Sequence, residues 1–194
     1  LIRGTMTLLV EEIRLLEVRI AQLERELTAL ARHSPACTTL LSIPGVGLLT
    51  ATAMVAATSG EVSHFRDARH FASWFGLTPK EHSSGGTRHL GRISKRGDRY
   101  LRMLLTHGAR AVLRAASVAA HAGKTVDGLR QWALGVQHRS NHNKATCALA
   151  NKLARICYAT LRDSEPYGTA RLNKKVTRTA FALPCRMMLV YHNI

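Results

Sequence analysis

Apolar residues recur at alternating intervals of four and three near the start of the chain. They occupy Leu9, Ile13, Leu16, Ile20, Leu23, Leu27 and Leu30. This alternation fills the a and d positions of successive heptads and is typical of a coiled coil. The pattern predicts one helix over residues 7–32, which either packs on its own domain or pairs with another helix.

A second apolar pattern surrounds the turn sequence Pro44-Gly45-Val46-Gly47. An alanine-rich helical pattern follows the turn, so the segment resembles a helix-hairpin-helix. The bare amides at the start of a helix bind phosphate without reading base sequence. We therefore expect Gly45 and Gly47 to bring the backbone close to DNA, and an ordinary turn between two helices is the alternative.

A helical period begins near Asp98 and separates two faces. The apolar face consists of Leu101, Leu105, Gly108, Val112 and Ala116, and the other face carries Arg99, Arg102, Thr106, Arg110 and Arg114. The segment should form an amphipathic helix whose apolar face is buried.

A loop is expected before this helix, and with the helix it forms a cationic track. We define the cationic track as Arg88, Arg92, Lys95, Arg96, Arg99 and Arg102. A solvated charged face normally mixes both signs, whereas the one acid within the span of the track is Asp98. We expect the track to hold phosphates of DNA or RNA.

The remaining periodicity predicts a mainly α fold. A short helix is expected over residues 67–75, with Asp67 as its cap and aromatic neighbours in the core, and a long helix is expected over residues 142–161. The chain then divides into a coiled-coil helix for dimerisation (1–34), a compact helical domain with the helix-hairpin-helix and a serine loop (35–163), and a basic, poorly ordered tail (164–194).

Charge and composition narrow the functional classes. The 194 residues contain 28 Lys and Arg against 12 Asp and Glu, a formal net charge of +16. Such a surface favours polyanions, nucleic acid first. No apolar run reaches the about 18 residues of a spanning helix, so we expect no membrane segment. The four cysteines lack a framework spacing, which favours a reduced, cytoplasmic protein.

Few residues suit catalysis. Cys147 and Cys157 lie on one expected helix, about 15 Å apart, so they cannot share a zinc ion with His138 and His142. The acids outside the first helix are too scattered for a two-metal nuclease. A serine within 83–84, between glycines and the cationic track, either attacks a phosphodiester or forms part of a phosphate-binding loop.

Four stretches in order carry a resemblance: LLSIPGVGLLTATAMVA, FASWFGLTPKEHSSGG, GRISKRGDRYLRMLL and KATCALANKLARICYATL. They resemble the C-terminal domain of insertion-sequence transposases of the one-ten family, with the match closest to the eleven-eleven branch. PGVG alone is a weak signal, whereas PGVG, FGLTP, SSGG and ISKRGDRYLR in this order are a strong one.

The resemblance implies specific roles. The family serine that joins covalently to DNA directly precedes a glycine, which makes Ser84 the implied nucleophile and Ser83 the alternative. Family members carry an N-terminal RuvC-like domain with a DEDD carboxylate set, where a divalent metal such as magnesium is expected. They dimerise, a coiled coil links their domains, and they are associated with a structured guide RNA. This chain itself is expected to need no cofactor or metal.

One departure from the family limits these expectations. The DEDD domain is absent, and the chain starts at Leu1 just before the heptads. We therefore expect a C-terminal part of a transposase that supplies Ser84, inactive alone. The alternatives are a truncated, non-catalytic nucleic-acid-binding remnant that dimerises with intact transposase, and a structural protein that assembles through its coiled coil.

Overall fold

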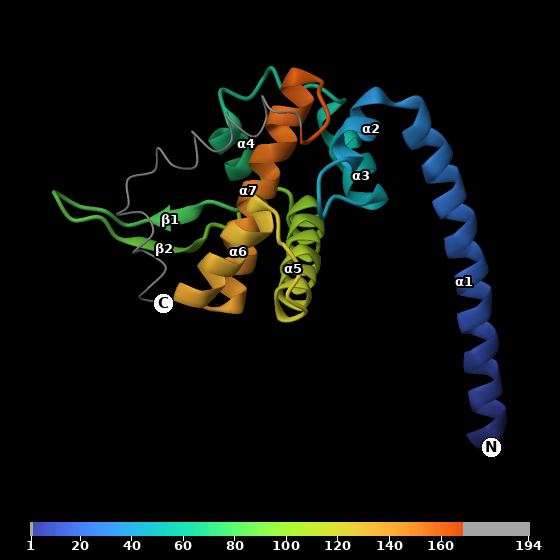
Figure 1. Ribbon diagram of the computed structural model, residues 1–194. Helices are drawn as coiled ribbons and strands as arrows, with labels where there is room; N and C mark the ends of the chain where they lie inside the picture. The colour runs from blue at the N-terminus through green and yellow to red at the C-terminus, as the bar shows by residue number, and fades with distance from the viewer. Residues whose placement is uncertain (1, 169–194) are drawn as a thin grey trace.

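All the described secondary structure is helical apart from one small hairpin (Figure 1). The computed structural model describes residues 2–168. The helices are α1 (Ile2–His33), α2 (Pro35–Leu41), α3 (Leu48–Thr58), α4 (Ala68–Trp74), α5 (Arg99–His121), α6 (Gly128–Arg139) and α7 (His142–Asp163), and the strands are β1 (Pro79–Glu81) and β2 (Leu90–Ile93). The predicted mainly α fold with a long N-terminal helix is confirmed. Most of the predicted tail, residues 169–194, lies outside the described residues.

Helix α1 stands away from the rest of the molecule (Figure 1) and contacts it only near its C-terminal end, through α2 and α3. Its one buried residue is Ala31. The heptad seam is open to solvent, with Ile13 56% and Leu23 58% exposed. Ser34 ends the helix and caps α2 by accepting a hydrogen bond from the Cys37 amide. The seam is therefore not used to pack α1 on its own domain.

Helix α7 is the central element of the core, and α4, α5 and α6 pack around it. Leu149, Leu153 and Ile156 of α7 are essentially inaccessible, as are Leu105 and Leu113 of α5. The predicted apolar face of α5 is confirmed, since Leu101, Leu105, Val112 and Ala116 are all buried.

The aromatic residues before the hairpin belong to the same core. Phe71 and Phe75 are fully buried and meet edge to face, with ring centroids 4.8 Å apart. The Tyr158 hydroxyl donates to the Phe65 carbonyl at 3.2 Å. Asp67 caps α4 by accepting from the amides of Arg69 and His70, as predicted. These rings thus fix α4 against α7 and are not a platform for stacking bases.

The turn between α2 and α3 contacts α5 where Gly45 of the turn meets Gly108 of the helix. Gly45 has a φ of +87°, and its carbonyl lies where a Cβ on Gly108 would stand. A Cβ on Gly45 would in turn meet Val112 Cγ2 at 2.6 Å. The PGVG turn is therefore packed directly on the backbone of α5, and both glycines are required by this contact.

Replacing Gly108 by alanine is expected to destabilise the domain by about 1–3 kcal/mol, because the new methyl group overlaps the Gly45 carbonyl and the turn must move. Gly135→Ala is the matched control, since Gly135 also lies inside a helix and its nearest neighbour for a Cβ is Arg139 Nη1 at 3.8 Å. The control should be neutral or stabilising by up to about 1 kcal/mol. Thermal unfolding followed by circular dichroism measures both, and equal melting temperatures would contradict the packing argument.

Candidate nucleic-acid interface and serine hairpin

The predicted serine loop is a two-stranded antiparallel hairpin. β1 and β2 pair with Glu81 opposite Leu90, and Ser84 and Thr87 exchange backbone hydrogen bonds of 3.3 Å at the tip. Gly85 has a φ of +58°, whereas the φ of Gly86 is not positive. This is the pattern of a type II′ turn. Residues 81–89 are all exposed, and the hairpin projects from the helices (Figure 1). Ser84, which bridges to Thr87 across the turn, therefore lies at the exposed tip.

The two serines have different surroundings. The Ser83 hydroxyl donates to Glu81 Oε1 at 2.7 Å and accepts from the His89 amide at 3.2 Å. Arg88 Nε also donates to Glu81 Oε1, at 3.2 Å. The Ser84 hydroxyl makes no hydrogen bond with any residue in the described part of the chain. Ser83 therefore joins the two strands, whereas Ser84 is available to an incoming group.

Glu81 is a poor base for its serine neighbour. The hydrogen bond from Ser83 and the charge of Arg88 hold the pKa of the Glu81 carboxyl below its ordinary value. The carboxylate thus accepts the Ser83 hydrogen bond while having little tendency to take the proton. Because Ser83 Oγ also accepts from the His89 amide, its lone pairs are partly engaged. Both effects favour Ser84 over Ser83 as the reactive hydroxyl.

The His82 ring is not placed to deprotonate Ser84. His82 pairs with His89, its amide donating to the His89 carbonyl at 2.8 Å. The His82 ring covers Gly91, with Cδ2 and Nε2 3.6 and 3.7 Å from the position of a Cβ there. Gly91 lies toward the base of the hairpin, so this ring is directed away from Ser84.

The base of the hairpin is fixed to the core on both strands. The Lys95 amide donates to the Gly76 carbonyl at 3.0 Å, and the Ser94 amide to the Thr78 carbonyl at 2.8 Å. Any Cβ on Gly97 would collide with the Trp74 carbonyl. Asn151 of α7 donates to the Leu77 carbonyl at 3.1 Å. The FGLTP and SKRGD segments therefore pack against each other and hold the exposed tip on a rigid base.

Some residues of the cationic track are exposed without an ion pair, and others contact neighbouring residues of the chain. Arg92, Lys95, Arg96 and Arg99 are exposed and, among the residues the structure describes, form no ion pair. Arg88 is paired with Glu81. Arg102 is half-buried and donates to the Phe75 carbonyl at 2.9 Å, which connects α5 to α4. Four of the six side chains of the track are thus exposed to solvent and available to a ligand. Arg102 also stabilises the contact between α5 and α4.

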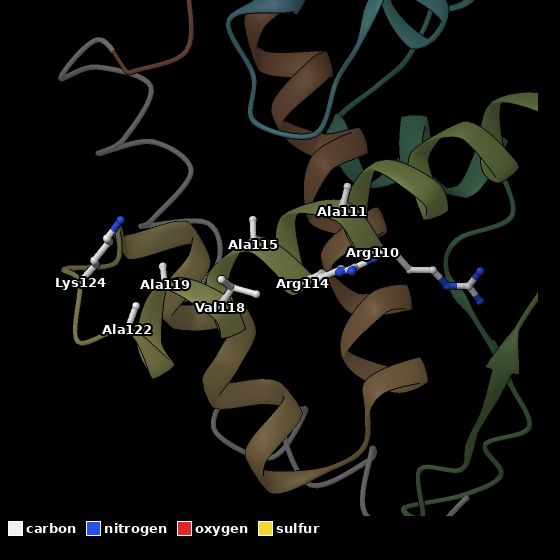
Figure 2. A pocket seen from close by; sticks show the side chains of 8 residues that line it. All are labelled: Arg110, Ala111, Arg114, Ala115, Val118, Ala119, Ala122 and Lys124. Carbon is white, nitrogen blue, oxygen red and sulfur yellow. The ribbon is translucent and has the colours of Figure 1, made fainter.

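The outer face of α5 extends the cationic surface along the helix. Arg110, Arg114 and Lys124 line a shallow groove of about 640 Å³ together with alanines and Val118. Figure 2 shows Arg110 at one end of the groove and Lys124 at the other, with the small side chains between them. Sequence reasoning missed Lys124 because it follows the helix, outside the periodic pattern. The small side chains leave room for a polyanion to approach between the cations.

The two glycines of the PGVG turn differ in accessibility. Gly45 is half-buried against α5, as described above, so packing explains its presence. Gly47 is exposed and is the N-cap of α3, without a side-chain cap and with nothing within 4 Å of a Cβ. α2 and α3 do pack together across the turn. That this pair binds DNA as a helix-hairpin-helix stays a prediction, and Gly47 is its better-placed residue.

The cysteines and acids are not arranged as a metal centre. Within residues 2–168, no group of three or more His, Cys, Asp or Glu side chains is positioned to hold a metal ion. Burial raises the pKa of the Cys157 thiol to about 12, and the pKa of the Cys147 thiol is also raised by burial. The described residues therefore do not fit the divalent metal that the resemblance implies for a RuvC-like domain.

Of the described helices, none is both long enough and apolar enough to cross a membrane.

Comparison with known proteins shows similarity to transposases. Residues 37–123, which contain the PGVG turn, the hairpin and α5, match the family model described as Transposase IS116/IS110/IS902 family. The chain is 48% identical over 151 residues to a probable family 20 transposase of Pseudomonas aeruginosa, covering 78% of this chain and 43% of that protein. It is 41% identical over 148 residues to the transposase for insertion sequence element IS1111A of Coxiella burnetii, covering 76% of this chain and 39% of that protein.

These matches confirm the resemblance of the chain, read from the motifs, to insertion-sequence transposases of the IS110 family. A further relative, 34% identical over 145 residues, is the insertion element IS110 uncharacterized 43.6 kDa protein of Streptomyces coelicolor. The chain spans about two fifths of the length of the first two curated relatives.

Proposed function

We propose that this chain is the DNA-binding part of an insertion-sequence transposase and supplies Ser84 as the nucleophile for strand cleavage and joining. The observation that carries the proposal is the free Ser84 hydroxyl at an exposed tip whose rigid base leads directly into the cationic track. A nucleophile for a phosphodiester needs access to phosphorus and cations to neutralise the phosphate oxygens. The tip supplies the first, and Arg92, Lys95, Arg96 and Arg99, toward the base of the hairpin, would hold neighbouring phosphates of the same strand.

The proposed step is a transesterification. Ser84 Oγ forms a bond to phosphorus, one P–O ester bond of the DNA strand breaks, and the released strand end takes up a proton as a hydroxyl. The serine proton leaves to solvent water or to a base of the complete transposase. No oxidation or reduction occurs, and the phosphoserine ester keeps the bond energy needed for rejoining. Magnesium is expected in the RuvC-like domain, outside this chain, and no step is assigned to it.

A mapping experiment tests the covalent step. A complete transposase containing this segment is incubated with its DNA, denatured and digested with nuclease and trypsin. Cleavage after Lys80 and Arg88 releases residues 81–88, EHSSGGTR, with both serines on one peptide. Fragmentation by mass spectrometry should place the nucleotide remnant on Ser84. A modification elsewhere, or none despite strand transfer, would contradict the proposal.

The proposed partners are inferred from the exposed cations of the cationic track and from the exposed heptad seam of α1. DNA is the main partner of the cationic track, and a structured guide RNA would supply the sequence choice that this chain, with phosphate-directed cations, does not make. Exposure of the heptad seam favours a homo-oligomer built through α1. The same seam would let a truncated, non-catalytic copy dimerise with intact transposase, which is the alternative function.

Charge on the seam is expected to abolish assembly. Changing both Leu16 and Leu23 to Glu places carboxylates at facing positions of a coiled coil, which desolvation and repulsion disfavour. The parent chain should sediment as a dimer or larger species at micromolar concentration and the double variant as a monomer. Leu8→Glu with Val18→Glu is the matched control, because both residues are more exposed, at 67% and 64%, and lie off the seam. A monomeric parent would contradict pairing through α1.

A further inference from the structure

Two cations on α7, Lys152 and Arg155, are half-buried. Lys152 and Arg155 are separated by three positions and so lie on one side of the helix. The Lys152 ammonium lies over the Trp132 ring of α6, with Nζ 3.9 Å from the ring centroid. Arg155 interacts electrostatically with Arg69 of α4. Residues from α4, α6 and α7 thus meet at this place, whereas the cationic track lies on the hairpin and α5.

The charges at this place are not balanced by acids. Within residues 2–168 neither Lys152 nor Arg155 forms an ion pair, and Arg155 Nε is buried without a hydrogen-bond partner. Asp67 acts on Arg155, but its carboxylate already caps α4 and pairs with Arg66 at 3.4 Å. Residues 169–194 contain no Asp or Glu. Residues 169–194 therefore cannot supply the missing charge with a side-chain carboxylate.

Partial burial of these neighbouring cations is energetically unfavourable. Burial, with a smaller contribution from the charge of Arg155, lowers the pKa of Lys152 to about 8. Burial, and then Arg69, likewise lowers the pKa of Arg155, while Asp67 opposes that shift. Partly desolvated like charges are unfavourable unless an anion neutralises them, and an unneutralised cluster is typical of a binding site.

We propose that Lys152, Arg155 and Arg69 form a second phosphate-binding site, which holds the backbone of a nucleic-acid strand on the α4–α7 side of the domain. A guanidinium fork and an ammonium are the groups that bind phosphodiester oxygens. The Trp132 ring holds the ammonium in place by a cation–π contact. Two separate phosphate sites would let one domain hold two segments of nucleic acid at once, as joining of strands requires. This inference shares with the proposed function only that the chain binds nucleic acid.

Binding by the 194-residue chain tests the proposal, with labelled duplex DNA, single-stranded DNA and single-stranded RNA as separate probes. Lys152→Met and Arg155→Met should each weaken binding of at least one probe about three- to tenfold and reduce its salt dependence by about one phosphate contact. Arg162→Met is the matched control, because Arg162 lies on the same helix but is paired with Asp163 at 2.9 Å. The control should stay within about twofold of the parent. Unchanged binding of all three probes in both variants would overturn the proposal.

Stability separates a binding role from a structural one. Because the buried ammonium is unneutralised, Lys152→Met should leave the melting temperature unchanged or raise it while affinity falls. A variant that loses affinity only in proportion to lost folding would count against the site. Lys152→Arg keeps the charge and should restore binding.

The pH dependence gives an independent readout. A bound phosphate favours the charged lysine, so above pH 8 the free protein must take up a proton to bind, and affinity should fall as the pH rises from 7 to 9.5. The charged group that acts on Lys152 is Arg155 of its own helix, α6 contributes the uncharged Trp132 ring, and Arg69 and Asp67 of α4 act on Arg155. Lys152→Arg should show a shallower fall than the parent, and identical slopes would overturn the role of Lys152.

The outcomes distinguish this inference from the proposed function. If variants of the cationic track lose affinity while the Lys152 and Arg155 variants do not, only the second site fails. If the parent chain binds none of the three probes above the level of a generic basic protein, both proposals fail. If the probe affected is RNA alone, the site belongs to the guide strand, and if it is DNA, to the substrate.

Discussion

Replacing Ser84 by alanine in a complete transposase is expected to abolish the covalent protein–DNA adduct, with a loss of more than about a thousandfold in its rate of formation. The hydroxyl makes no hydrogen bond with the described residues and lies at the exposed corner of the turn, so its removal should leave the hairpin folded. The adduct is measured as labelled DNA that migrates with the protein on a denaturing gel. DNA binding, measured in parallel, should stay within about twofold.

Ser83→Ala is the matched control for this experiment. The Ser83 hydroxyl connects Glu81 to the His89 amide, so its loss should loosen the hairpin and slow adduct formation by about tenfold or less without abolishing it. The opposite ranking, with Ser83→Ala inactive and Ser84→Ala active, would assign the nucleophile to Ser83. Adduct formation by the double variant would exclude both serines.

Sequence patterns predicted α4 and α5 because each has a buried face and a side-chain cap. The spacing of apolar residues on α5, with Asp98 accepting from the Leu101 amide at 2.7 Å, is local information. Asp67 does the same for α4. Such signals need only a few neighbouring residues, and they identified these two elements to within about a residue at their starts.

The hairpin escaped prediction because its strands are only three and four residues long, so no alternation of apolar residues indicates them. The difference between Ser83 and Ser84 depends on partners across the hairpin, which a sequence of eight polar residues does not specify. The role of Gly45 was likewise set by Gly108, which lies far along the chain on α5. Contacts of this kind become visible only in three dimensions.

The Lys152 and Arg155 pair shows a further limit of sequence reasoning. Spaced three apart on a helix, the two cations look like ordinary surface residues of α7. Only the arrangement of α4 and α6 shows that they are half-buried and near another cation without an ion pair. Net charge predicts that the chain binds a polyanion, and the place that we propose for this second site depends on the fold.

Neutralising the free part of the cationic track is expected to give the largest loss of nucleic-acid binding. Changing Arg92, Lys95, Arg96 and Arg99 to Gln removes four exposed cations that make no ion pair with the described residues. If each contacts one phosphate of duplex DNA, the slope of log affinity against log salt should become less steep by about 3.6, and affinity at 0.1–0.2 M salt should fall by about a hundredfold or more. Fluorescence anisotropy across a salt series measures both quantities.

The control for this prediction must change the net charge equally. Replacing Arg14, Arg19, Arg25 and Arg32 of α1 by Gln also removes four exposed cations, but these alternate with glutamates along the helix. Their field is therefore largely cancelled locally, and the control should lose less than about fivefold in affinity. Equal losses in the two quadruple variants would mean that the chain binds through overall charge alone. The hairpin and α5 would then have no special place in binding, and the position of Ser84 on this hairpin would no longer support its role as the nucleophile.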